Sequence, residues 1–97
     1  MTEGTQKSVT GDAVLRFAPH VRFRFDEVRQ AWVVLAPERL LLPDEQAVEI
    51  LQLIDGERAV DSVIDELVFR YEAPRDVVAT DVVRMLQDLV DKRMLRR

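Results

Sequence analysis

The chain has 97 residues, a net charge of −4 and no cysteine, and its length fits one small domain. The lack of cysteine excludes disulfides, thiolate metal sites and cysteine nucleophiles. No apolar run approaches the roughly 20 residues of a membrane span, and the N-terminus lacks the apolar core of a signal peptide, so we expect a cytoplasmic protein without a membrane partner.

The first part of the chain differs in composition from the rest. Residues 1–14 are rich in Thr, Gly and Ser and show no hydrophobic periodicity. We therefore expect a flexible N-terminal arm over 1–14 and one folded domain over 15–97, with order beginning near Leu15.

Three short segments predict a small antiparallel sheet. Residues 21–26 alternate between apolar and charged side chains, which indicates a strand with one buried face. Residues 31–36 are rich in β-forming side chains and would pair back across a short connector. Pro37 would end this strand and open a turn, completed by Glu38 and Arg39, that leads into a third strand over 39–42.

Three helices are predicted after the strands. Asp44 is a candidate N-cap for a helix over 45–54, which Gly56 would end. Apolar residues recur at helical spacing from Val60 to Tyr71. Pro74 would begin a third periodic run that extends to residue 95. Strands followed by helices predict an α+β, winged helix-turn-helix-like fold, with a three-stranded antiparallel sheet and then three helices.

Reactive side chains are few. The chain has a single histidine, His20, and two serines, Ser8 and Ser62, which lie far apart in the sequence. The acids follow the polar positions of the predicted helices, and the three glycines form no phosphate-binding loop. We therefore expect no enzyme, no metal site and no cofactor.

The charge distribution disfavours nucleic acid as a partner. Residues 44–91 carry thirteen acids against four arginines, and the third helix alone contains Asp76, Asp81, Asp88 and Asp91. A helix that enters the DNA major groove needs basic or amide side chains, and phosphates would repel this one. We expect no nucleic-acid binding, and a winged-helix DNA-binding transcription regulator remains an alternative hypothesis.

The surplus of apolar surface suggests a binding function. Leu40, Leu41 and Leu42 cannot all face one core, since neighbouring strand side chains point to opposite faces. The apolar arc of the third helix is also wider than one packing partner requires. If the strand lies beside this helix, the two would form an apolar groove with an open strand edge, which is typical of peptide binding by strand addition. A homodimer or ordinary core packing would also account for these side chains.

The residues also match a known family. "RFRFDEVRQAWVVLAPER", the apolar strand that follows it, the helix ending in "DGERAV" and the segment "ELVFRYEAPRDVV" resemble the PqqD family of pyrroloquinoline quinone (PQQ) biosynthesis. The most specific part is the cluster of Arg29, Trp32, Leu35, Pro37 and Glu38. The resemblance covers about residues 15–95.

The resemblance implies a non-catalytic peptide chaperone. Such a protein would bind the precursor peptide PqqA and present it to the radical S-adenosylmethionine (SAM) enzyme PqqE. In related domains the peptide lies as an added strand against the third strand and over the third helix. Carried onto this sequence, the implied peptide-binding residues are Arg39, Leu40, Leu41, Leu42, Val82, Val83, Met85, Leu86, Leu89 and Val90. Pro37 and Glu38 would form the turn or contact the partner.

Overall fold

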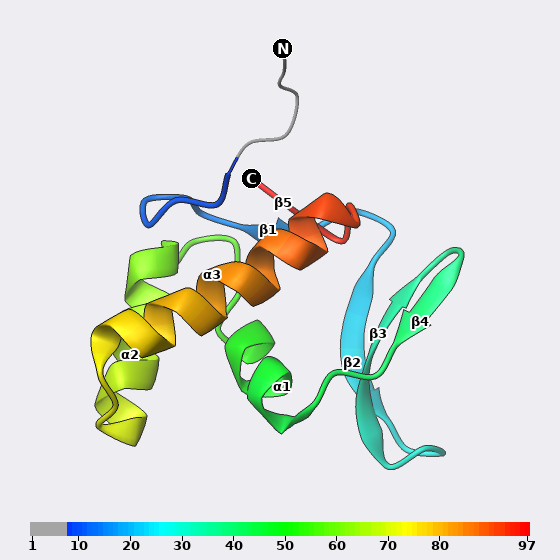
Figure 1. The fold of residues 1–97 in the computed structure, drawn as a ribbon. Helices are drawn as coiled ribbons and strands as arrows, with labels where there is room; N and C mark the ends of the chain where they lie inside the picture. Colours follow the sequence, from blue (N-terminus) through cyan, green and yellow to red (C-terminus); the bar gives the residue numbers. More distant parts are fainter. Residues whose placement is uncertain (1–7) are drawn as a thin grey trace.

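The structure of the chain, a computed structural model, describes residues 8–97 and confirms the predicted α+β fold (Figure 1). The predicted sheet is present in the order β2-β3-β4, and an additional two-stranded sheet pairs β1 with β5. The elements are β1 (Arg16–Phe17), β2 (Arg22–Asp26), β3 (Ala31–Ala36), β4 (Arg39–Leu41), α1 (Glu45–Gln52), α2 (Val60–Tyr71), α3 (Arg75–Asp91) and β5 (Leu95–Arg96). Within residues 8–97 no helix is long and apolar enough to cross a membrane.

The register of the three-stranded sheet sets which side chains face the core. Phe23 of β2 lies opposite Val34 of β3, and Val34 lies opposite Leu41 of β4. Val34 is buried in the main core, and Phe23 and Leu41 pack against it. The alternation predicted for residues 21–26 is confirmed at Phe23, with Arg22 and Arg24 on the other face. It fails at the end of the strand, where Phe25 is 40 % exposed and Asp26 is only 8 % exposed.

Asp26 organises the turn between β2 and β3. Its carboxylate accepts hydrogen bonds from the backbone N–H groups of Val28, at 3.0 Å, and Arg29, at 3.3 Å. The Arg29 guanidinium lies 2.6 Å from the same carboxylate. This hydrogen bond from Arg29 is the main reason that the pKa of Asp26 lies below its ordinary value. The arginine of the sequence cluster thus stabilises the hairpin.

The first helix begins as predicted but ends earlier. The Asp44 side chain caps α1 by accepting a hydrogen bond from the backbone N–H of Ala47 at 2.8 Å. The helix ends at Gln52 instead of residue 54. Asp55 then accepts hydrogen bonds from two following backbone N–H groups, and Gly56 adopts a φ of 80° in this turn. The left-handed glycine therefore belongs to the loop, since it lies beyond the helix cap.

The other two helices differ from the prediction at their ends. Tyr71, expected on the buried stripe of α2, is 57 % exposed. Helix α3 ends at Asp91, and Arg93 takes a left-handed φ of 64°. The chain then buries Met94 and Leu95 and forms β5 in place of the predicted helical extension to residue 95. The sequence pattern could not show this because β5 needs β1, which lies almost the whole chain away.

Order begins earlier than expected in the N-terminal part. Val9 and Ala13 are buried in the main core. The backbone N–H of Val9 donates to the Gln87 side chain at 2.7 Å, and Val60 donates to the Ala13 carbonyl at 2.9 Å. The side chains of Val9 and Ala13 thus fill the core beside α2 and α3, although both residues lie in the segment 1–14 that was expected to be an arm. Residues 1–7 lie outside the described residues.

Candidate binding surface

The outer edge of β4 has no strand partner within residues 8–97. β4 pairs with β3 on one side only, so it is an edge of the three-stranded sheet. An edge strand presents backbone N–H and C=O groups that an added strand can pair with. The third strand, expected over 39–42, is therefore present as an open edge over Arg39–Leu41, and Leu42 lies just beyond it.

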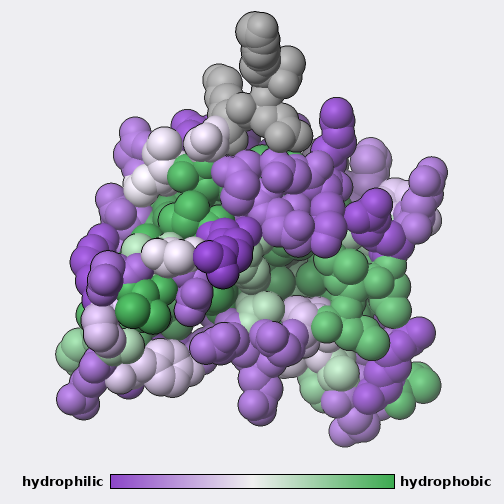
Figure 2. Space-filling model, in the orientation of Figure 1, coloured by the Kyte–Doolittle hydropathy of each residue, from purple (hydrophilic) through white to green (hydrophobic). Residues whose placement is uncertain are grey.

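The three leucines divide between the two faces of the sheet. Leu41 is half-buried and packs against the core. Leu40 is opposite Leu35 on the other face and is 37 % exposed, and Leu42 is 61 % exposed. Apolar side chains, drawn green in Figure 2, gather over the sheet and in a hollow between the sheet and α3. Leu40 and Leu42 are thus the leucines available to a partner.

The apolar arc predicted on α3 is only partly accessible. Val82, Leu86 and Leu89 are at most 6 % exposed and belong to the main core. Val83, Met85 and Val90 are half-buried. The buried three cannot offer much contact area to a ligand without repacking the core, so the accessible part of the arc is narrower than the sequence suggested.

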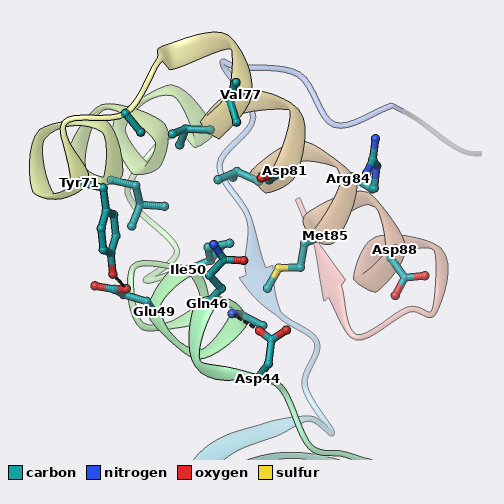
Figure 3. A pocket seen from close by; sticks show the side chains of 15 residues that line it. Asp44, Gln46, Glu49, Ile50, Tyr71, Val77, Asp81, Arg84, Met85 and Asp88 are labelled. Atoms are coloured by element: carbon teal, nitrogen blue, oxygen red, sulfur yellow. Dashed lines mark hydrogen bonds between the residues drawn. The ribbon is translucent and has the colours of Figure 1, made fainter.

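A cavity of about 680 Å³ lies between α1, the end of α2 and α3 (Figure 3). Its apolar lining comes from Ala47, Ile50, Leu67, Ala73, Val77, Val78, Val82 and Met85. Two residues of the predicted site, Val82 and Met85, line it. The sequence analysis did not predict that α1 and α2 contribute to the binding surface. The helical spacing of apolar residues in α1 could have indicated an apolar face there. The cavity reaches Asp44, which follows β4 closely in the chain.

The polar rim of the cavity is mainly acidic. Its charged lining residues are Asp44, Glu49, Asp81, Arg84 and Asp88. Glu49 accepts hydrogen bonds from Tyr71 and Arg70, and Asp88 pairs with Lys92 at 2.8 Å. The hydrogen bonds from Arg70 to Glu66 and to Glu49 raise the pKa of Arg70. The remaining acids, Asp44 and Asp81, have no ion-pair partner among the described residues.

The remaining candidate residues lie in the connection between β3 and β4 or pack within the sheet. Pro37 and Glu38 are exposed and form the two-residue connection between β3 and β4, with Arg39 already in the strand. Trp32 stacks on Phe23, with ring centroids 4.8 Å apart, and meets Phe25 edge-on. In the described part of the chain, no group of three or more His, Asp or Glu residues could hold a metal ion.

The fold and this surface define a small α+β binding domain of winged helix-turn-helix-like order, with an open strand edge and an apolar cavity. The family model described as coenzyme PQQ synthesis protein D (PqqD) matches residues 31–95. The chain therefore belongs to the PqqD family, as its sequence suggested.

Named relatives agree with this membership. A Rhodopseudomonas palustris (strain BisB5) protein, 60 % identical over 76 residues that cover 78 % of this chain and 74 % of that one, is named PqqA binding protein. A Gluconobacter oxydans protein of the same name is 40 % identical over 95 residues, 98 % of each chain. These names describe binding proteins, which confirms the expectation of a non-catalytic protein.

A solved structure shows the same fold. The solution structure of the PqqD part of Methylobacterium extorquens PqqCD has a TM-score of 0.75 and 41 % identity, covering 91 % of this chain and 94 % of that one. That protein is described as a functional, stand-alone recognition element for ribosomally synthesized and post-translationally modified peptides. The comparison confirms the predicted fold class.

Proposed function

We propose that this chain binds the precursor peptide PqqA by strand addition and presents it to the radical SAM enzyme PqqE in the cytoplasm. The observation that carries the proposal is the open edge of β4, flanked by exposed Leu40 and Leu42. PqqA would pair its backbone with β4, and its side chains would contact these leucines and the accessible side of α3.

The names of the relatives support the choice of peptide. Proteins that are 57–62 % identical to this chain over 76 residues are named PqqA binding proteins. The relevant side chains on α3 are Val83, Met85 and Val90, which are half-buried, and not their buried neighbours. Ordering a flexible peptide costs free energy, so we expect a dissociation constant near the micromolar range, about −8 kcal/mol of binding free energy.

Amide chemical-shift mapping tests where the peptide binds. Titrating the isotope-labelled chain with PqqA should shift the amides of residues 38–42 and those around Met85. Shifts confined to the turn between β2 and β3 and to the start of α2 would reject strand addition at β4.

Sedimentation at several concentrations, with and without PqqA, would show whether a second copy of the chain occupies the edge instead.

Presentation to PqqE needs its own experiment. Mass spectrometry should detect modified PqqA when PqqE and this chain are both present, and much less when the chain is omitted. Equal modification in the absence of the chain would reject presentation and leave peptide binding intact.

A further inference from the structure

The cavity between α1 and α3 begins at Asp44, shortly after the end of β4 in the chain. β4 runs from Arg39 toward Asp44, which lines the cavity. One end of a strand paired with β4 therefore lies beside Leu41, and the chain reaches the rim of the cavity at Asp44. The proposed function brings PqqA against Met85, which lines the cavity, but it leaves the acidic rim of the cavity without an assigned role.

The floor of the cavity suits an aliphatic side chain. Ile50 and Val82 line it and are 7 % and 1 % exposed, so they form a fixed apolar surface. Met85 extends from α3 toward Asp44 and Gln46 (Figure 3). A methionine side chain adapts to ligands of different shape. The volume of about 680 Å³ has room for more than one peptide side chain.

The rim of the cavity suits a cation. Asp44 accepts a backbone hydrogen bond at the start of α1, but this bond does not neutralise its charge. Asp81 has no basic partner within ion-pair distance among the described residues. The only basic lining residue is Arg84, which extends away from α1 in Figure 3. The rim therefore keeps uncompensated negative charge next to an apolar floor.

We propose that this cavity is a subsite for a lysine or arginine side chain of PqqA that flanks the strand-paired segment. The alkyl stem of that side chain packs on Met85, and its charged head lies at the acidic rim, to which Asp44 contributes from α1 and Asp81 from α3. Long basic side chains commonly bury the stem and keep the head at a polar rim. This inference rests on the proposed function, because it assumes that PqqA is the peptide on β4.

The first arm of the test removes charge from the protein without changing its shape. Asp44→Asn with Asp81→Asn keeps a good helix cap at position 44. Binding of PqqA, measured by calorimetry at low salt, should weaken about fivefold, and this loss should shrink at high salt. The matched control is Asp91→Asn, on the same helix but outside the cavity, which should bind PqqA as the unmodified chain does.

The second arm removes charge from the peptide. PqqA with its lysines and arginines replaced by glutamine should lose a similar factor against the unmodified chain and little more against the double variant. The subsite would be overturned if the double variant bound PqqA with unchanged affinity. It would also be overturned if the affinity losses from the protein and peptide substitutions multiplied when the two were combined. The peptide comparison remains valid even if the double variant folds poorly, because the unmodified chain must still bind the substituted peptide more weakly than PqqA itself. A chain that binds no PqqA at all would instead reject the proposed function.

Discussion

Leu41 lies directly opposite Val34 where β4 pairs with β3, and this register turns Leu41 toward the core. Its neighbour Leu40 lies opposite Leu35 on the other face of the sheet. The two leucines therefore have different roles although they are adjacent in the chain. A slip of one residue in this pairing would exchange the two faces.

Leu41→Ala should lower the free energy of unfolding by about 1–2 kcal/mol, below the roughly 2–5 kcal/mol typical of a fully buried leucine. The reason is that Leu41 packs on the core from a half-buried position. Urea unfolding measures this change. Leu42→Ala is the control, because Leu42 is 61 % exposed, and it should change stability by less than about 0.5 kcal/mol. Equal losses from the two substitutions would contradict the assigned faces.

Leu40→Asp together with Leu42→Asp should weaken PqqA binding about tenfold or more and leave the domain folded. Both side chains are exposed beside the open edge, so their replacement removes apolar contact without opening the core. Titration of the peptide measures the loss of binding, and the circular dichroism spectrum shows whether the domain is folded. Phe69→Asp removes an apolar side chain that is 81 % exposed on α2, and it should leave binding unchanged. Unaltered binding by the double variant would argue against the β4 edge.

The contrast between Leu86 and Met85 tests which side of α3 faces the peptide. Leu86→Ala should cost roughly 2–5 kcal/mol of stability, because Leu86 is fully buried. Met85→Ala should cost less stability and instead weaken PqqA binding, since Met85 lines the cavity. Thermal unfolding and peptide titration of both variants separate the two effects. The assignment fails if Met85→Ala unfolds the domain and leaves the affinity of the remaining folded protein unchanged.

Arg16→Glu should raise stability by about 0.2–1 kcal/mol at low salt. Arg16 lies directly opposite Arg96 in the pairing of β1 with β5, so two positive charges face each other across the strands. The gain should shrink in high salt because the charges are exposed and screened. Arg22→Glu is a matched control, since Arg22 is opposite the uncharged Leu35. A larger gain from Arg22→Glu would show that the pair does not repel.

Asp26 should contribute to the pH dependence of stability. The hydrogen bond from Arg29 is the first cause of its low pKa in the folded chain. Its stabilisation is therefore complete above the ordinary pKa of about 3.8 and is lost as the pH falls through the lower folded pKa. Urea unfolding from pH 7 to pH 2 should show the unmodified chain losing its advantage over Asp26→Asn in that acidic range. An advantage that is constant over all pH values would contradict this role. Asp12 and Asp55, whose pKa values are also lowered, are present in both proteins and cancel in the comparison.

Most elements could be predicted from local patterns. The alternation in residues 21–26, the β-forming run over 31–36 and the helical spacing of residues 60–71 each depend on side chains close in sequence. The cap at Asp44 was also a local signal, because its partner is the backbone of Ala47. The ends of α1 and α3 were predicted too late in the chain, since both helices stop before the apolar pattern does.

The candidate surface was only partly predictable. The surplus of leucines indicated an exposed strand, and Leu40 and Leu42 are exposed. The sequence predicted too many peptide-binding residues on α3, because a periodic pattern does not distinguish buried from half-buried side chains. The buried residues are Val82, Leu86 and Leu89, and the half-buried ones are Val83, Met85 and Val90. Which side chains of α3 are buried depends on the elements that pack around the helix. Some of the core residues, such as Val9 and Met94, come from opposite ends of the chain, so a local pattern does not reveal them.

The sequence by itself determined the order of the three sheet strands and three helices, the open third strand and the acidic character of the helices, because each follows from neighbouring residues or from composition. Only the tertiary structure decided that Leu41 turns inward, that Leu95 leaves the helical pattern to pair with Phe17, and that Asp44 and Asp81 share one cavity. The physical reason is the same in each case. Strand register and side-chain burial are set by contacts between residues distant in the sequence, and local pattern carries no information about those contacts.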